Sequence, residues 1–139
     1  MRLFSIFLLL YSFIFWAACN ETIQKDALQG YWQIDKVTQA NETFVPATGN
    51  IQFDHYTLVA MGKGYRKKLS PSLGETLITS RDRSDFTLES QRDSWQLHFQ
   101  TPWDEWYEKI SRLDSQELVL EHNNKRYYYK RKNLTDGRP

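Results

Sequence analysis

The chain has 139 residues, with 18 lysines and arginines against 17 aspartates and glutamates, and a single cysteine. This length suits one domain behind a leader segment. The balanced charge excludes nucleic acid as the main partner, because phosphate binding depends on an excess of lysine and arginine. One cysteine also excludes an internal disulfide framework.

Residues 1–18 predict a secretory signal peptide. Arg2 precedes an apolar run from Leu3 to Trp16, and the small pair Ala17–Ala18 follows. The run is shorter than the roughly 20 apolar residues that cross a bilayer as a helix. Polar residues begin at Asn20, so we expect cleavage rather than a membrane span.

Cys19 directly follows the small pair. This arrangement resembles the lipobox of bacterial lipoproteins, in which the cysteine thiol receives a diacylglyceryl group and the chain is cut just before it. The aliphatic residue usual three positions earlier is Trp16 here. The alternative is an ordinary signal peptide with an incidental cysteine. The resemblance implies lipid anchoring through Cys19 to a membrane of the bacterial cell envelope, on its periplasmic or surface side.

Residues 19–28 form a polar tether, in which Ile23, Ala27 and Leu28 lie at roughly helical spacing. The tether is either one helical turn over a barrel end or a plain linker. From Gly30 the pattern changes to period two, with Trp32 and Ile34 on one face, as in half-buried strands. Residues 38–50 contain asparagine, proline and glycine and are predicted to be a loop.

The rest of the chain predicts short strands without a helical stripe. A tight turn is expected at Asp54–His55, and the basic stretch Tyr65–Leu69 is a strand or a loop. Residues 101–104 interrupt the pattern at Pro102, and residues 122–124 form a hairpin connection. Strands are expected over residues 51–53, 56–61, 76–79, 85–89, 94–100, 105–113, 117–122 and 125–132.

Roughly eight to ten strands with turns every 8 to 12 residues are typical of an antiparallel sandwich or barrel. We predict an all-β fold, a small antiparallel up-and-down β-barrel of about eight strands over residues 29–134. A short tail, residues 135–139, follows it.

Two stretches resemble the lipocalins. Leu28–Ile34 contains Gly30-Tyr31-Trp32, which resembles the Gly-x-Trp motif that opens the first strand of lipocalins and other calycins. The closing stretch, residues 110–113, 117–120 and 125–131, is similar to the end of bacterial lipocalin-like lipoproteins. The resemblance implies that a basic residue of the final strand packs over Trp32. We assign this role to Arg131, with Lys130 as second choice.

The resemblance also implies that the barrel binds a small hydrophobic ligand. The chain is shorter than most lipocalins and lacks their disulfide pair, so a filled barrel stays open as the alternative. The rival hypothesis is a protein-binding envelope lipoprotein, an inhibitor or assembly accessory. Candidate contacts for a ligand or partner are Trp95, His98, Trp103, Trp106, Tyr107, Tyr127 and Tyr129.

Catalytic motifs are absent from the sequence: no nucleophile elbow, zinc-binding His-Glu-x-x-His or phosphate loop occurs. We therefore predict no enzyme, no metal and no cofactor. Asp104, Glu105 and Glu108 lie among aromatic residues, as in a glycosidase, but their spacing fixes no carboxylate separation. A barrel rim with solvated charges is preferred. Basic runs such as Arg66-Lys67-Lys68 are interpreted as solvated faces, with anionic lipid headgroups as the alternative.

Overall fold

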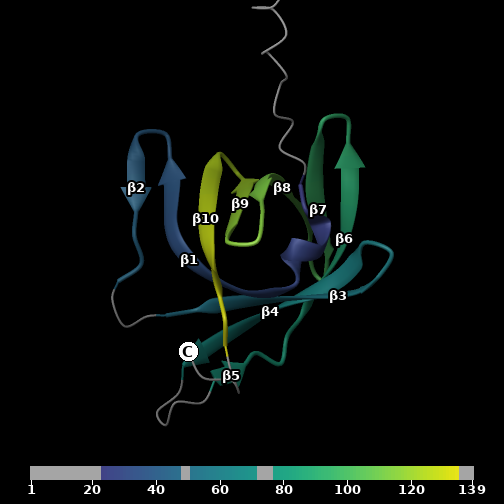
Figure 1. The fold of residues 1–139 in the computed structure, drawn as a ribbon, viewed down its shortest axis with the longest axis horizontal. Coiled ribbons are helices and arrows are strands. Elements are labelled where there is room, and N and C mark those ends of the chain that lie inside the picture. Colours follow the sequence, from purple (N-terminus) through teal and green to yellow (C-terminus); the bar gives the residue numbers. More distant parts are fainter. Residues whose placement is uncertain (1–22, 48–50, 72–76, 135–139) are drawn as a thin grey trace, which may run out of the picture.

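The structure, a computed structural model, describes residues 23–47, 51–71 and 77–134 (Figure 1). The predicted signal peptide, Cys19 and residues 135–139 lie outside the described residues. Within the described ranges the elements are a 3-10 helix, η1 (Lys25–Leu28), and ten strands: β1 (Gly30–Gln39), β2 (Glu42–Phe44), β3 (Phe53–Ala60), β4 (Lys63–Pro71), β5 (Leu77–Thr79), β6 (Ser84–Gln91), β7 (Ser94–Gln100), β8 (Glu105–Leu113), β9 (Glu117–His122) and β10 (Lys125–Lys132).

Eight of the described strands close into one antiparallel barrel. Their order around the ring is β1, β3, β4, β6, β7, β8, β9 and β10, and β10 pairs back with β1. The short strands β2 and β5 extend the sheet from β1 and β4. Each barrel strand lies beside the next one along the chain, so the predicted all-β, up-and-down barrel is confirmed. Closure removes the long free edges that recruit other chains.

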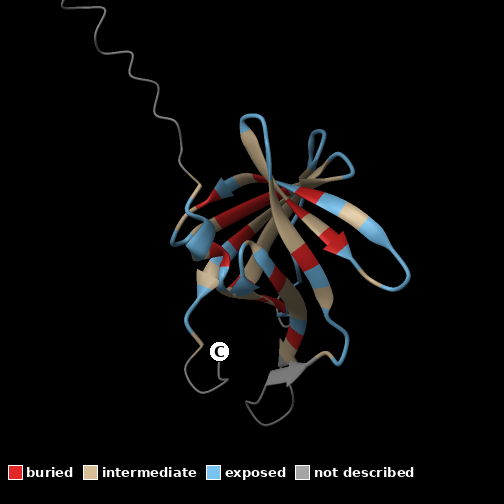
Figure 2. Ribbon diagram, turned by 90° about the vertical axis from the view of Figure 1, so that its right-hand side faces the viewer, coloured by how far each residue is buried: buried red, intermediate tan, exposed pale blue. Residues whose placement is uncertain are grey.

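Apolar side chains fill the barrel interior, and Figure 2 shows buried residues recurring along the strands. Because successive side chains point to opposite faces, each strand contributes every second residue. Leu97, Phe99 and Leu118 in this core are fully inaccessible to solvent. The core is therefore packed shut around them.

The helix η1 covers one end of the barrel. Leu28 is fully buried, Ile23 and Ala27 pack against the core, and the Gln24 amide donates to the Leu113 carbonyl over 3.4 Å. Of the two alternatives for the tether, its described part, residues 23–28, shows the helical turn. We call the opposite end, where residues 101–104 and the turn 123–124 lie, the mouth.

Two local predictions are wrong. The predicted loop at 38–50 begins with strand: β1 continues to Gln39 and returns as β2 after the two-residue turn Ala40–Asn41. Ala40 adopts the left-handed conformation, φ 51°, that such a tight turn requires. No turn occurs at Asp54–His55, because β3 runs through both residues. The Asp54 carboxylate forms an ion pair with Lys68, and this pairing allows a charged residue to lie within the strand.

The expected hairpin near residue 123 is confirmed. Asn123 and Asn124 both have positive φ, 50° and 60°, and join β9 to β10. Two successive left-handed residues make the type I′ turn, whose twist matches that of antiparallel strands. Asparagine tolerates this conformation better than most residues, so the sequence specifies the turn locally.

Candidate functional site

The indole of Trp32 lies at the capped end of the barrel. Its ring is fully buried, and its Nε1 donates to the Leu28 carbonyl over 2.8 Å. The guanidinium of Arg131, the register partner of Trp32 on β10, lies over the ring with Cζ 4.3 Å from the centroid. This is the arrangement proposed for these two residues. It joins the first and last strands through a cation–π contact.

Arg131 also binds three backbone carbonyls. It donates to Ser115 over 2.6 Å and to Gln29 over 2.9 Å, and its Nη2 donates to Ala27. A Cβ at Gly30 would lie 2.5 Å from Arg131 Nη1, and Gly30 has φ 129°. Only glycine is compatible with both the close approach of the Arg131 guanidinium and the positive φ. The Gly30–Trp32–Arg131 set therefore has a structural role.

Next to the apolar core lies a group of polar side chains that we call the interior polar cluster: Asp54, Tyr56, Arg66, Lys68, Glu108 and Tyr129. Arg66 Nη1 lies 3.1 Å from both oxygens of Glu108 and 3.2 Å from the Tyr56 hydroxyl. Trp106 Nε1 donates to Glu108 Oε1 over 2.9 Å. Three strands, β3, β4 and β8, thus meet at one ion pair.

A second ion pair connects this cluster to solvent. Lys68 Nζ lies 2.8 Å from Asp54 Oδ1; the side chain of Asp54 is 5% exposed and that of Lys68 is 59% exposed. The two cations and two anions of the cluster balance. Because an unpaired buried charge is costly, this balance explains how the charges of Asp54, Arg66 and Glu108 are accommodated in the barrel, with Lys68 reaching in from the solvent.

The surroundings shift the ionisation of the cluster. Burial raises the pKa of Tyr56, opposed by the charge of Arg66, and burial raises the pKa of Tyr129 well above its usual value. Burial alone would lower the pKa of Arg66, but its interactions with Tyr56, Glu108 and Asp54 outweigh burial and raise that pKa. At neutral pH the cluster therefore presents a charged guanidinium and protonated tyrosine hydroxyls.

Some donors of the cluster have no partner among the described residues. All hydrogen bonds of Arg66 use Nη1, which leaves Nε and Nη2, and Tyr129 makes none through its hydroxyl. In the described part of the chain, no buried side-chain nitrogen or oxygen is both sealed from solvent and unpartnered. These donors of Arg66 and Tyr129 therefore reach space that water can enter.

Aromatic rings lie beside the guanidinium. Arg66 Cζ is 4.2 Å from the centroid of Phe99, and Trp106 stacks on Phe99 with centroids 4.9 Å apart and planes 10° apart. Trp106 and Tyr127 are only partly buried and pack against the core. The arrangement combines hydrogen-bond donors with partly accessible apolar walls, which is typical of small-molecule sites.

The architecture decides the fold type: a closed ring of eight described up-and-down strands, opened by a Gly-x-Trp strand whose indole lies under an arginine of the last strand. The fold is lipocalin-like.

Two solved structures from Bacteroides are similar to this chain. A lipocalin-like protein from Bacteroides uniformis is 12% identical and has a TM-score of 0.48, covering 76% of this chain and 99% of its own. An uncharacterised protein from Bacteroides eggerthii is 8% identical, with the same TM-score and coverage. No family model matches the chain, and no curated protein matches it.

The lipocalin-like barrel divides the predicted contact residues. Trp95, Trp106, Tyr127 and Tyr129 contribute to its interior. Of these, Trp95 lies at the capped end, under Lys25, whose Nζ is 3.7 Å from the ring centroid. The structure does not bring the remaining three to this interior. His98 and Tyr107 stack on each other outside the barrel, and Trp103 is 92% exposed in the connection before β8.

Outside the barrel, His98 bridges two carboxylates. Its Nδ1 lies 2.9 Å from Glu89, and its Nε2 contacts Glu105. The hydrogen bond with Glu89 raises the pKa of His98. Burial opposes this rise, and the hydrogen bond with Glu105 and the charges of both carboxylates add to it, so the net shift is upward. Among the described residues no group of three histidine, cysteine or acidic side chains is arranged to hold a metal ion.

Of the three acidic residues of the glycosidase alternative, Asp104 lies exposed in the connection before β8, and strand alternation separates Glu105 from Glu108. Glu105 faces outward toward His98, whereas Glu108 faces inward toward Arg66. The two carboxylates therefore do not flank a common space.

Sequence reasoning missed four members of the interior polar cluster: Asp54, Tyr56, Arg66 and Lys68. Arg66 and Lys68 were interpreted as part of a solvated basic face. Their spacing of two along a strand was a usable signal, because it places both on one face with Asp54 and Tyr56 opposite them. The acid partner Glu108 is 42 residues away from Arg66, and no local pattern connects them.

Proposed function

We propose that this protein is a lipid-anchored, non-enzymatic binding protein of the bacterial envelope, which takes a small amphipathic molecule at the mouth of its barrel. One observation carries the binding proposal: donors of Arg66 and Tyr129 lie inside the barrel without a described partner, yet within reach of water. The head group of the ligand would accept hydrogen bonds from them, and a carboxylate suits a guanidinium best.

The energetic cost of the cluster supports this proposal. An apolar pair of similar volume in place of Arg66 and Glu108 is often neutral or stabilising in a protein interior. Retaining a charged pair there is therefore poorly explained by stability alone. Recognition of the polar head group of a ligand inside the barrel would explain why the Arg66–Glu108 pair is retained.

The packed core sets the shape of the ligand. Leu97 and Phe99, which pair with Glu108 and Trp106 in register, are fully buried, so we propose that the ligand stays on the mouth side of these two residues. Its apolar part would lie against Trp106 and Tyr127 near the mouth. A flat or short ligand fits this space better than a long chain buried along the barrel axis.

Fluorescence titration with anilinonaphthalene sulfonate, a flat apolar anion, and competition by decanoate test the proposal. We expect saturable binding that falls at least tenfold in the double variant Arg66→Met/Glu108→Leu, which removes both charges together. Arg126→Met, on the outer face, is the matched control. Equal affinity of the folded double variant and the parent would overturn the proposal.

Anchoring needs its own test. The leader, the small pair and Cys19 support lipid anchoring. Only three residues separate Cys19 from Ile23, where the described structure begins. Labelling of cells with radioactive palmitate should mark the protein, and Cys19→Ser should abolish the label. An unlabelled parent protein with an intact Cys19 would contradict acylation.

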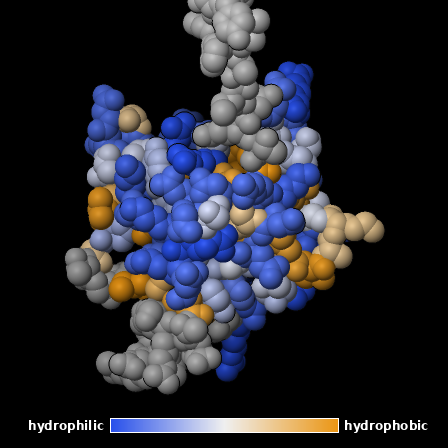
Figure 3. Space-filling view, in the orientation of Figure 1, coloured by the Kyte–Doolittle hydropathy of each residue, from blue (hydrophilic) through white to orange (hydrophobic). Residues whose placement is uncertain are grey.

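The alternative function is binding of a protein partner at the mouth. It is favoured by Trp103, which is 92% exposed, and by the half-exposed Tyr107 nearby. On the face drawn in Figure 3, by contrast, apolar residues form separate spots within a hydrophilic surface. Cross-linking in cells through a photoreactive residue at position 103 should capture one partner if this alternative is correct, and position 92 is the control.

A further inference from the structure

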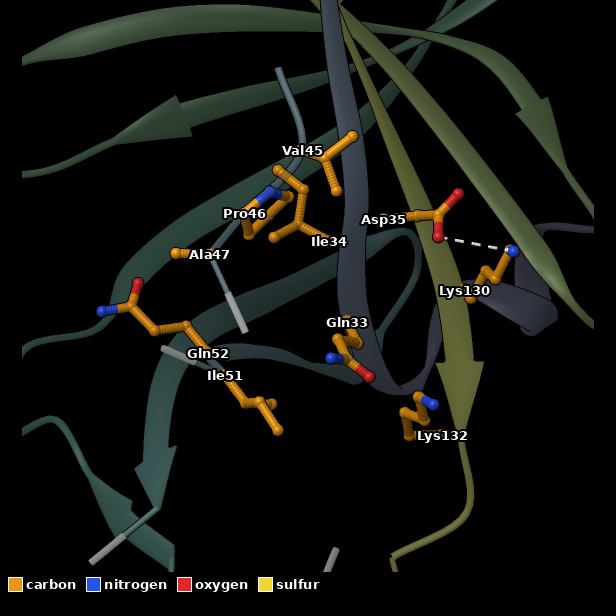
Figure 4. Close-up of a pocket in the computed structure, with 10 residues that line it drawn as sticks. All are labelled: Gln33, Ile34, Asp35, Val45, Pro46, Ala47, Ile51, Gln52, Lys130 and Lys132. Carbon is orange, nitrogen blue, oxygen red and sulfur yellow. Dashed lines mark ion pairs between the residues drawn. The ribbon is translucent and has the colours of Figure 1, made fainter. Parts of the chain in front are cut away.

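A hollow of about 420 Å³ lies on the outside of the barrel, where β1 and β10 meet residues 45–47, which follow β2, and residues 51–52, which precede β3. Figure 4 shows it, with the side chains of Val45, Pro46 and Ile51 on one side and Lys130 and Lys132 on the other. We call it the outer groove. It is separate from the interior polar cluster, because Lys130 and Lys132 face outward between the inward residues of β10.

One wall of the outer groove is unusually apolar for a surface. Val45, Pro46 and Ala47 line this wall. They directly follow the exposed Phe44, so four consecutive apolar residues are exposed, and Val45 is 70% exposed. Ile51 adds a fifth exposed apolar side chain. A run of this kind is costly in water unless it meets a partner. Nothing in the strand geometry of β2 requires apolar residues after Phe44.

The other wall is basic. Lys130 Nζ lies 3.4 Å from Asp35 Oδ1, with both side chains largely in solvent. Lys132 has no ion-pair partner among the described residues. The groove therefore carries two ammonium groups against one carboxylate, and it complements a ligand that joins an anionic head to an apolar chain.

The proposed anchor would bring this groove close to such ligands. The four Cα–Cα steps from Cys19 to Ile23 span at most about 14 Å. Lys132 pairs with Tyr31 at the start of β1, soon after η1. A barrel on so short a tether cannot stand far from the bilayer surface.

We propose that the outer groove binds an anionic phospholipid of the anchoring membrane. Lys130 and Lys132 hold its phosphate, and part of an acyl chain lies along Val45, Ala47 and Ile51. This inference rests on the proposed anchoring for access to the membrane, but the groove itself needs no acylation. Binding would fix one side of the barrel against the bilayer and leave the mouth open.

The test is native mass spectrometry of the mature chain in detergent, with added phosphatidylglycerol or phosphatidylcholine. We expect one phosphatidylglycerol adduct to persist and phosphatidylcholine to be lost. Lys130→Gln/Lys132→Gln should reduce the adduct at least tenfold, since each lysine near an anionic lipid contributes about fivefold. Val45→Ser/Ile51→Ser should also reduce the phosphatidylglycerol adduct, because it removes the apolar wall of the groove.

The controls are Lys125→Gln and Val59→Ser, which lie away from the groove and should leave the adduct unchanged. Equal adducts in the parent and in the lysine double variant, or equal loss in the control variants, would overturn the inference. Repeating the assay on Cys19→Ser separates this result from acylation. The titration of the Arg66→Met/Glu108→Leu variant reports on the mouth independently.

Discussion

The carboxylate of Glu108 holds the guanidinium of Arg66 inside the barrel, with Arg66 Nη1 3.1 Å from each carboxylate oxygen. The two side chains are 11% and 12% exposed. Such a pair depends on both members, since each is the main compensation for burying the other. It fixes β4 against β8 across the interior, where neighbouring strands do not connect them.

Removing one member of this pair should cost more than removing both. We expect Glu108→Leu to lower the free energy of unfolding by about 3 to 5 kcal/mol, because Arg66 is left as an uncompensated buried charge. Adding Arg66→Met should restore most of that loss. Urea unfolding of the two single variants and the double variant measures the effect. Additive losses would show that the two side chains do not interact.

The capped end should be sensitive to Gly30. Gly30→Ala places a Cβ where Arg131 Nη1 lies and forces an L-residue to φ 129°. We expect a loss of about 1 to 3 kcal/mol, typical of a strained backbone position. Thermal unfolding reports it. Combining the change with Arg131→Ala relieves the clash but not the backbone strain, so partial recovery is expected, and full recovery would rule out strain.

The His98 bridge should make stability depend on pH. The folded-state pKa of His98 is raised by Glu89 and Glu105, so the protonated form is favoured by folding. Its contribution is fully present below the unfolded value near 6.5 and is lost as pH rises through the raised folded pKa.

Thermal unfolding at pH 5.5 and pH 8.5 checks this dependence. We expect the parent to lose stability, relative to His98→Gln, on going to the higher pH. Titration of the His98 ring by NMR gives the pKa directly. A value at or below 6.5 would remove the bridge as an interaction in solution.

One surface change should stabilise the protein. Met61 and Gly62 form the two-residue turn between β3 and β4, with φ 48° and 73°. Asparagine followed by glycine is the preferred sequence for such a turn. Met61→Asn should therefore raise the free energy of unfolding by about 0.5 to 1 kcal/mol. Met61→Ala serves as the control, since it shortens the exposed side chain but still disfavours positive φ.

The barrel was predictable because its signals are local. Alternation around Trp95, Leu97 and Phe99 marks a strand whichever neighbour it has, and Asn123–Asn124 specifies its own turn. Arg131 could be placed over Trp32 because the resemblance to lipocalins supplied the pairing of the first and last strands. The leader and Cys19 stay predictions, since they lie outside the described residues.

The interior polar cluster was not predictable in the same way. A charged residue within a strand usually indicates a solvated face. This rule fails when a partner from a distant part of the sequence compensates the charge. Asp54 interrupts an apolar pattern, so a turn was the reasonable interpretation. Its partner Lys68 lies on the next barrel strand, and Glu108 meets Arg66 across the barrel. Only the closed ring brings these groups together.

The pairing of β1 with β10 also constrains how the chain reaches its native form. A polypeptide that leaves the ribosome or crosses a membrane with its amino end first exposes β1 long before residue 132 emerges. The edge of β1 that pairs with β10 therefore has no partner until residues 125–132 are available. Loss of that strand by proteolysis would reopen the cylinder along its whole length rather than shorten it.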